Sequence, residues 1–285
     1  MSVVVTGATG HLGRLIVEAL IARGVPAAHI TATGRSTDRI ADLAEWGVTV
    51  KHADYLDPAS LDAAFAGADT LVLVSSGDFE DRAGQHRTAV DAAKRAGVGR
   101  IVYTSIANAA TSTLLLAQDH QATEAYIQES GIPYTFLRNS WYAENYTAQL
   151  PIYLEHGIAG SAGDGKVSIA TRADYAEAAG AVVVGEGHEN TAYELGGEAV
   201  TLGELAVIAS KATGQDIAYA DLPLEVFTGI LVGAGLPEPV AAVYADADRG
   251  IRAGELYVDP ATLEGLIGRP ATPALDAFTA AAAAL

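Results

Sequence analysis

Three glycines, each separated from the next by two residues, stand near the N-terminus of this 285-residue chain, in Thr6-Gly-Ala-Thr-Gly-His-Leu-Gly13. Gly7 permits a tight turn after a strand-like run of valines, Gly10 lets the backbone approach a pyrophosphate, and Gly13 lets a following helix pack closely on the strand. Because a helix N-terminus attracts anions, the segment predicts a dinucleotide site. Its predicted residues are Gly7, Ala8, Thr9, Gly10, His11, Leu12 and Gly13. A structural turn without phosphate is the alternative.

An arginine stands where sites for NAD carry an acidic residue. Thr33-Gly-Arg35-Ser follows the second strand-like run, about 20 residues beyond the glycines. A guanidinium suits the 2′-phosphate of NADP, and no carboxylate stands there to repel it. We therefore expect NADP(H) as the cofactor; a solvated surface arginine is the alternative.

Further polar residues follow the next strand-like runs. Asp54 and Tyr55 come after the third run and are expected to meet the adenine. Ser75, Ser76 and Gly77 end the fourth, at the rim where open α/β sheets bind ligands.

Strand-like and helical patterns alternate over the first 140 residues and predict a doubly wound parallel sheet of the Rossmann type. The expected strands are Val3–Thr6, Ile30–Thr33, Val48–Lys51, Thr70–Val74, Arg100–Thr104 and Tyr134–Leu137. The expected helices lie near Leu12–Arg23, Arg39–Glu45, Ala59–Phe65, Gln85–Ala96 and Gln118–Ser130. We expect an NADP-binding domain over 1–140 and a smaller mixed α/β substrate lobe over 141–285. The lobe is expected to return to the sheet edge near 182–195, through Val182–Val184 and Tyr193–Leu195.

Composition excludes several classes of protein. The chain has no cysteine, so disulfides and thiolate chemistry are excluded. Its net charge of −18 argues against nucleic-acid or anionic-membrane partners. Most of this charge lies in residues 171–285, where 5 basic and 17 acidic residues give a net charge of −12. No apolar run is long enough for a membrane span, and the N-terminus lacks a signal-peptide pattern, so a cytoplasmic protein is expected. The histidines lack metal-type spacing, and we expect no metal.

The chain resembles the NmrA-like atypical short-chain dehydrogenase/reductases, and within them the bacterial quinone reductases. The narrowest matching segments are Arg138-Asn-Ser-Trp-Tyr-Ala-Glu-Asn-Tyr146 and Ala162-Gly-Asp-Gly-Lys166. The resemblance implies NADPH as cofactor and a quinone as hydride acceptor. It places the nicotinamide near Ser75, Ser76, Asn139, Trp141 and Tyr142, with Lys166 near the substrate. With Arg82, Thr104 and Ser140, these complete the expected cofactor-binding set.

The proton donor of most short-chain reductases is missing. None of the twelve tyrosines has a lysine four residues later, so there is no Tyr-x-x-x-Lys. The helix on which that motif would lie carries His120 and Glu124 instead, which share one face. His120 is then a polar anchor or a weak acid oriented by Glu124, or the two form an exposed helix pair. Reduction of a quinone gives an aromatic oxyanion that water or a modest donor can protonate, whereas a simple ketone needs a strong acid. The expected catalytic residues are His120, Asn139, Tyr142 and Lys166.

Three functions stay open at this stage. An NADPH-dependent reductase of a small neutral quinone or related enone is favoured, because Trp141, Tyr142 and Tyr146 can sandwich a flat ring; a hydrophobic hinge between lobes is the alternative for these aromatics. A non-catalytic NADP-sensing regulator is the second candidate, and a biosynthetic reductase with an aromatic substrate is the third. A homodimer is compatible with all of them.

Overall fold

The computed structural model describes residues 1–78 and 80–285. The chain forms two compact units. Unit 1 comprises Met1–Ile106, Asp119–Arg138 and Arg172–Tyr193, and unit 2 comprises Ala107–Gln118, Asn139–Thr171 and Glu194–Leu285. The units therefore interleave along the sequence. The assignment of 1–140 to cofactor binding and of 141–285 to substrate binding stays a prediction.

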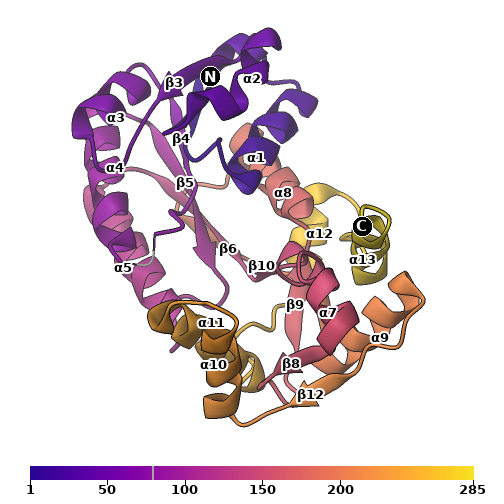
Figure 1. Cartoon of the computed structure of the whole chain (residues 1–285). Coiled ribbons are helices and arrows are strands. Elements are labelled where there is room, and N and C mark those ends of the chain that lie inside the picture. The colour runs from indigo at the N-terminus through magenta and orange to yellow at the C-terminus, as the bar shows by residue number, and fades with distance from the viewer. Residues whose placement is uncertain (79) are drawn as a thin grey trace. The chain divides into compact units, whose positions relative to one another are not determined.

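A seven-stranded sheet with helices on both faces lies mainly in unit 1 (Figure 1). Its order is β10-β6-β5-β4-β1-β2-β3, and β1 pairs in parallel with both β2 and β4. The order reverses beside β1, which confirms the doubly wound Rossmann fold. Folds of this kind bind ligands outside the carboxyl ends of the strands at the point of reversal, here β1 and β4. The strands are β1 (Val3–Val5), β2 (Ile30–Gly34), β3 (Thr49–His52), β4 (Thr70–Leu73), β5 (Arg100–Ile106), β6 (Tyr134–Asn139) and β10 (Thr191–Leu195).

Two groups of helices cover this sheet. On one side lie α3 (Pro58–Phe65), α4 (Arg82–Ala96) and α5 (Leu115–Ser130), and on the other α1 (His11–Ala22) packs on α8 (Arg172–Val184) (Figure 1). The core under α3, α4 and α5 includes the buried side chains of Phe65, Leu71, Ile101, Tyr103 and Ile127. Short helices η1 (Ala27–His29), η2 (Thr37–Ile40) and α2 (Asp42–Glu45) complete the connections between β1 and β3.

The predicted return to the sheet edge is partly wrong. Tyr193–Leu195 lies in β10 at the edge of the sheet, as expected, but Val182–Val184 ends helix α8 and forms no strand. Alanines dominate α8, and alanine favours helix more than any other residue. A Cβ atom at Gly180 would lie 3.3 Å from the Cβ of Ala19, so the small residue lets α8 approach α1 closely.

Unit 2 combines two small sheets with helices, as the predicted mixed α/β lobe requires. Strands β7 (Trp141–Tyr142), β9 (Val167–Ala170) and β11 (Glu198–Val200) form one sheet, and β8 (Ile158–Gly160) pairs in parallel with β12 (Tyr219–Asp221). The helices α9 and α13 pack together, as do α10 and α11. The helices of this part are α6 (Glu144–Thr147), α7 (Leu150–His156), α9 (Leu202–Thr213), α10 (Leu224–Gly233), α11 (Glu238–Arg252), α12 (Ala261–Ile267) and α13 (Ala274–Ala282).

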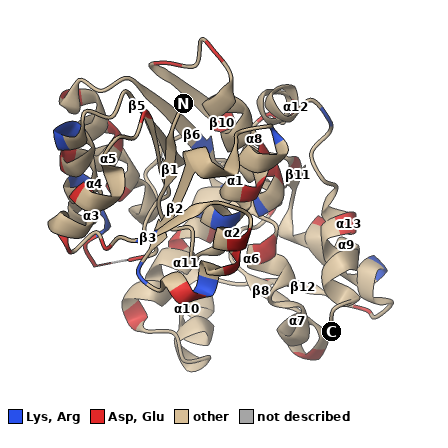
Figure 2. Cartoon of the chain, turned by 90° about the horizontal axis from the view of Figure 1, so that it is seen from above, with Lys and Arg blue, Asp and Glu red and all other residues tan. Residues whose placement is uncertain are grey.

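Acidic residues are spread over helices of both units, α3, α5, α10 and α13 among them (Figure 2). Within residues 1–78 and 80–285, no helix combines the length and the apolar character that crossing a bilayer requires.

The buried carboxylate of Asp248 on α11 fixes the loop that leads to Lys166. Its Oδ2 accepts a 2.6 Å hydrogen bond from the backbone N–H of Ser161. A Cβ atom at Gly160 would lie only 2.8 Å from the same oxygen, so this glycine is what lets the carboxylate approach the chain. Burial raises the pKa of Asp248 to about 6; the bond from Ser161 opposes the shift and the charge of Asp221 adds to it.

Gly13→Ala should destabilise unit 1. A methyl group there would overlap the carbonyl oxygen of Gly7, because α1 begins directly against the glycine loop. We expect the free energy of unfolding to fall by about 1–3 kcal/mol, the usual cost of overpacking. Gly229→Ala in α10 is the matched control: it has open space around it and should stabilise the chain by up to about 1 kcal/mol. Urea unfolding of both variants checks this, and equal changes would contradict it.

Asp248→Asn should remove a pH dependence of stability. The folded carboxyl keeps its proton up to about pH 6, whereas the unfolded one loses it near its ordinary value of 3.8. Between these values the folded state binds more protons, so the wild type loses stability as the pH rises from about 4 to about 6. Relative to the variant, this loss should be about 3 kcal/mol, since each pH unit between 3.8 and about 6 contributes about 1.36 kcal/mol. Urea unfolding across this interval measures it; a difference between the two proteins that is independent of pH would refute the assignment.

Candidate functional site

The glycine loop has the geometry of an anion-binding turn. Gly7 adopts a φ of 61°, in the left-handed region that favours glycine, and its carbonyl accepts the N–H of Gly10 at 2.9 Å. The N–H of Ala8 donates to the carbonyl of Thr33 at 2.8 Å, which joins the loop to the end of β2. The loop is thus shaped by internal bonds before any ligand binds.

The N-terminus of α1 carries no capping side chain. Its N-cap residue is Gly10, which has no side chain to accept from the first N–H groups. The first N–H groups of a helix need an acceptor, and an anionic group can supply one. The residues of this helix start therefore fit the predicted pyrophosphate.

Arg35 lies beside this loop, directly after β2. A Cβ atom at Gly34 would lie 2.5 Å from the side chain of Thr9, so the backbone after β2 packs on the loop. The side chain of Arg35 is exposed and makes no ion pair with any residue of the described chain. Its guanidinium is thus available to a phosphate, as the prediction requires.

Tyr55 is tied to the ends of β1 and β4. Its hydroxyl lies 2.7 Å from Oγ1 of Thr6 and 2.9 Å from the carbonyl of Val74, and Thr6 also accepts the N–H of Val74 at 2.9 Å. Burial raises the pKa of Tyr55, so the hydroxyl keeps its proton. The predicted neighbour Asp54 uses one carboxylate oxygen to accept the N–H of Leu56. The contact of Asp54 and Tyr55 with adenine stays a prediction.

The segment after β4 is held from two sides. The N–H of Ser75 donates to Oγ1 of Thr104 on β5 at 2.9 Å. Ser76 donates its hydroxyl to Gln85 at 2.7 Å and accepts from Nε of Arg82 at 2.8 Å. The Nη1 of Arg82 also pairs with Asp119 at 3.4 Å. Thr104 thus holds Ser75, and Arg82 holds Ser76. The contact of Arg82 with the cofactor stays a prediction. Gly77, the next residue, is exposed.

His120 is not oriented by Glu124, contrary to the sequence prediction. Glu124 accepts from Oγ of Ser105 and from the guanidinium of Arg138, both at 2.6 Å, while Nδ1 of His120 lies 2.7 Å from the hydroxyl of Tyr103. Both His120 and Glu124 are buried, so the alternative of an exposed pair is also wrong. Burial lowers the pKa of His120, and the charge of Arg82 lowers it further. The imidazole is neutral, and its catalytic role stays a prediction.

The remaining predicted residues belong to unit 2. Asn139 ends β6 with 3% of its surface exposed, and its Oδ1 has no hydrogen-bond partner within the described chain. Ser140 donates its hydroxyl to the carbonyl of Leu256 at 2.8 Å. Trp141 and Tyr142 form β7, parallel to β9, and the exposed Lys166 directly precedes β9. The aromatic rings are therefore carried on a paired strand, and the backbone on either side of Lys166 is fixed.

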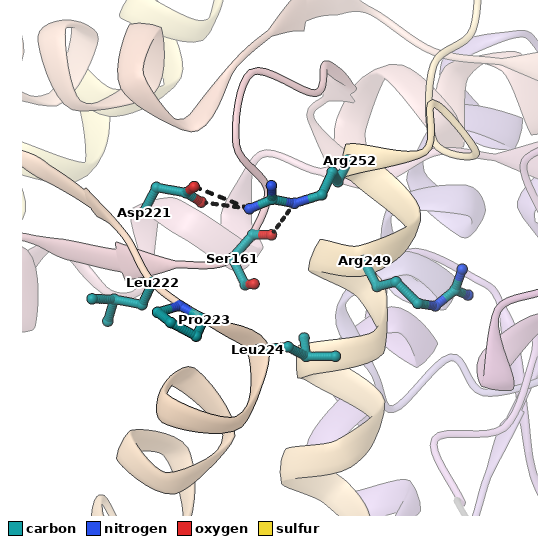
Figure 3. A pocket seen from close by; sticks show the side chains of 7 residues that line it. All are labelled: Ser161, Asp221, Leu222, Pro223, Leu224, Arg249 and Arg252. Atoms are coloured by element: carbon teal, nitrogen blue, oxygen red, sulfur yellow. Dashed lines mark hydrogen bonds and ion pairs between the residues drawn. The ribbon is translucent and has the colours of Figure 1, made fainter.

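A cavity of about 530 Å³ in unit 2 is a separate feature. Its lining consists of Ser161, Asp221, Leu222, Pro223, Leu224, Arg249 and Arg252 (Figure 3). Arg252 reaches both carboxylate oxygens of Asp221 and the carbonyl of Ser161, and Arg249 donates to two further carboxylates. These guanidinium groups already have partners, so they serve the packing of unit 2. The lining includes no residue that the sequence predicted for binding or catalysis.

Sequence reasoning missed some of the polar side chains that support the site. Thr6 accepts the N–H of Val74 at the end of β1, and Arg138 on β6 neutralises Glu124. Thr6 stands directly before the first glycine, so its position gave a weak signal. His86 was not missed: Gln85-His86-Arg87 predicts a core or supporting residue under the cofactor edge, and His86 on α4 accepts the N–H of Ser76. The partner of Glu124 comes from another element, and no local pattern reveals it.

Comparison with known proteins places this arrangement in a family. The NmrA-like family matches residues 1–261. "Quinone oxidoreductase 2" of Escherichia coli is 46% identical over 272 residues, which cover 95% of each chain. An NAD(P)H azoreductase of Xenophilus azovorans is 30% identical over 289 residues, which cover 99% of this chain and 98% of the azoreductase.

Solved structures agree along nearly the whole chain. An NADPH-dependent quinone oxidoreductase of Escherichia coli, complexed with NADPH, superimposes with a TM-score of 0.94 at 45% identity over 98% of this chain and 99% of its own. The triphenylmethane reductase of a Citrobacter species, complexed with NADP(H), gives a TM-score of 0.92 at 39% identity over 98% and 100%. The chain belongs to the NmrA-like family.

Proposed function

We propose that this protein is an NADPH-dependent reductase that transfers hydride to a quinone or a related conjugated carbonyl compound. The relatives that cover nearly the whole chain support a reductase, and two of the superimposed structures contain NADPH or NADP(H). The bound nicotinamide would supply the hydride. The chain has to bind that cofactor, hold its ring against the acceptor and leave room for a flat substrate.

The cofactor fits the residues of unit 1. The uncapped start of α1 suits a pyrophosphate, and the unpaired guanidinium of Arg35 suits a 2′-phosphate. Both lie at the carboxyl edge of a parallel sheet, where such cofactors bind. In a chain of net charge −18, these local positive groups are what lets an anionic cofactor bind.

Asn139 fits the nicotinamide end. A buried carbonyl oxygen without a partner costs free energy, and a native protein tolerates one where a ligand completes it. The carboxamide of nicotinamide carries N–H donors that suit an amide oxygen. We assign Asn139 the role of holding this carboxamide. Trp141, Tyr142 and Lys166 are assigned to the substrate, and a homodimer and a cytoplasmic location remain predictions.

The observation that carries the choice of substrate is the lack of an activated proton donor. The sequence has no Tyr-x-x-x-Lys, and Tyr103 is buried with its pKa raised. A positioned general acid accelerates a reaction by about 10²–10⁴-fold, which a simple ketone needs and a quinone does not. The reduced quinone is a weak base that water can protonate. A chain with these residues therefore favours quinones over unactivated ketones.

An assay of NADPH oxidation tests the function. We expect turnover with benzoquinone and naphthoquinone, and at least about 100-fold lower kcat/KM with an unactivated ketone such as cyclohexanone. Following NADPH absorbance with purified protein measures both. Failure to turn over any quinone, together with selective binding of one redox form of NADP, would replace the reductase by the NADP-sensing role.

Arg35→Asp should change the cofactor preference. The variant loses a charge-assisted bond to the 2′-phosphate and gains a repelling carboxylate, so the ratio of kcat/KM for NADPH over NADH should fall by about 100-fold. Arg39→Asp is the matched control, since Arg39 is also exposed and lies four residues further along on η2. If both variants lower the ratio equally, the effect comes from net charge and the assignment of Arg35 is wrong.

A further inference from the structure

Three side chains of α4 bond the polar groups of Ser76. Its N–H donates to Nε2 of His86 at 2.9 Å, and its carbonyl accepts from Nε of Arg82 at 2.8 Å. Its hydroxyl donates to Oε1 of Gln85 at 2.7 Å. Three residues of the first two turns of α4 therefore hold Ser76, while Thr104 on β5 holds the preceding Ser75.

The hydrogen bonds of His86 determine which of its nitrogens carries the proton. A backbone N–H can only donate, so Nε2 is unprotonated where it meets Ser76. The proton is then on Nδ1, which lies 2.8 Å from Oγ1 of Thr123. The hydroxyl of Thr123 donates its own proton to the carbonyl of Asp119 at 2.8 Å, so its oxygen accepts from Nδ1 of His86. The chain of bonds has one consistent direction.

A second proton on His86 would face a donor. The side chain is fully buried, and Nε2 already receives the N–H of Ser76. The charge of Arg82 acts on this ring. The rings of Tyr103 and Tyr55 pack edge-on to it, and the ring of His120 lies beside that of Tyr103. Burial, and then the charge of Arg82, lower the pKa of His86 to about 3. The imidazole is therefore a constant acceptor at neutral pH.

We propose that His86 is a positioning residue for hydride transfer: its neutral Nε2 fixes the Ser76 peptide, and that peptide sets the surface against which the nicotinamide ring lies. The proposal rests on the proposed function, because it places the nicotinamide beside Ser75 and Ser76. Every polar group of Ser76 is bonded inside the protein, so this residue contributes to the cofactor site through its position. A shift of about 1 Å in such a surface can change a rate by about 10²-fold.

Two substitutions separate the role of Nε2 from that of Nδ1. In His86→Gln the amide oxygen can reach the place of Nε2 and still accept from Ser76. In His86→Asn the shorter amide can replace only Nδ1, so the N–H of Ser76 loses its acceptor. We expect kcat with benzoquinone to fall about 10–100-fold in His86→Asn and to stay within about threefold of the wild type in His86→Gln. Thr123→Val is the matched control: it removes a buried partner of the same ring but leaves the bond to Ser76, and it should keep the wild-type kcat.

A binding measurement distinguishes this proposal from the proposed function. 2′-Phospho-ADP-ribose has every part of the cofactor except the nicotinamide. His86→Asn should weaken NADPH binding about tenfold or more and leave the affinity for 2′-phospho-ADP-ribose unchanged, as calorimetry can show without any turnover. Equal losses for both ligands, or equal losses of kcat in the Gln and Asn variants, would overturn the proposal. A wild type that binds NADPH but reduces no quinone would overturn the proposed function alone.

The wild-type protein provides a test that requires no variant to fold. ¹⁵N NMR of the imidazole should show Nδ1 protonated and Nε2 unprotonated from about pH 5 to about pH 8, because the folded pKa lies well below this interval. A proton on Nε2, or a titration within this interval, would rule out the role assigned to His86.

Discussion

Burial of polar groups at the ends of the central strands is the constraint on which the rest of unit 1 depends. An N–H withdrawn from water costs free energy unless another acceptor replaces the water. Thr6 accepts from Val74, and His86 accepts from Ser76. The first bond fixes the ends of β1 and β4 relative to one another, and the second fixes the segment after β4 relative to α4. The same bonds that prevent a loss of stability therefore also shape the edge at which the cofactor is proposed to bind.

Local patterns were enough to predict much of this arrangement. The six strands of the first 140 residues and the glycine loop follow from short-range signals, namely β-branched runs and glycine spacing. Predictions that depended on contacts with residues far away in the sequence were wrong more often. Val182–Val184 has a strand-like composition but continues an alanine-rich helix that packs on α1. His120 and Glu124 share a helix face, yet Arg138 on β6 pairs with Glu124. Where tertiary contacts compete with local preference, sequence reasoning has no means of weighing them.

Two buried imidazoles near Ser76 stay uncharged. Burial lowers the pKa of both His86 and His120, and the buried guanidinium of Arg82 lowers both further. Neutral rings can accept hydrogen bonds, which charged rings cannot. The net charge of the whole chain says little about this site, since acidic residues are spread over helices of both units (Figure 2). What matters to a bound anion is the few groups within its reach.

The packing of α8 on α1 has a consequence for how the chain folds during synthesis. Residues 172–193 belong to unit 1 but follow the long segment 139–171, which belongs to unit 2. When the ribosome has made only the first 140 residues, the apolar face of α1 has no α8 to cover it. The apolar face of α1 stays uncovered until α8, which ends at Val184, has been translated. Apolar surface that is exposed during synthesis makes a nascent chain prone to aggregation. The interleaving of the two units thus ties the completion of the nucleotide-binding fold to the late part of translation.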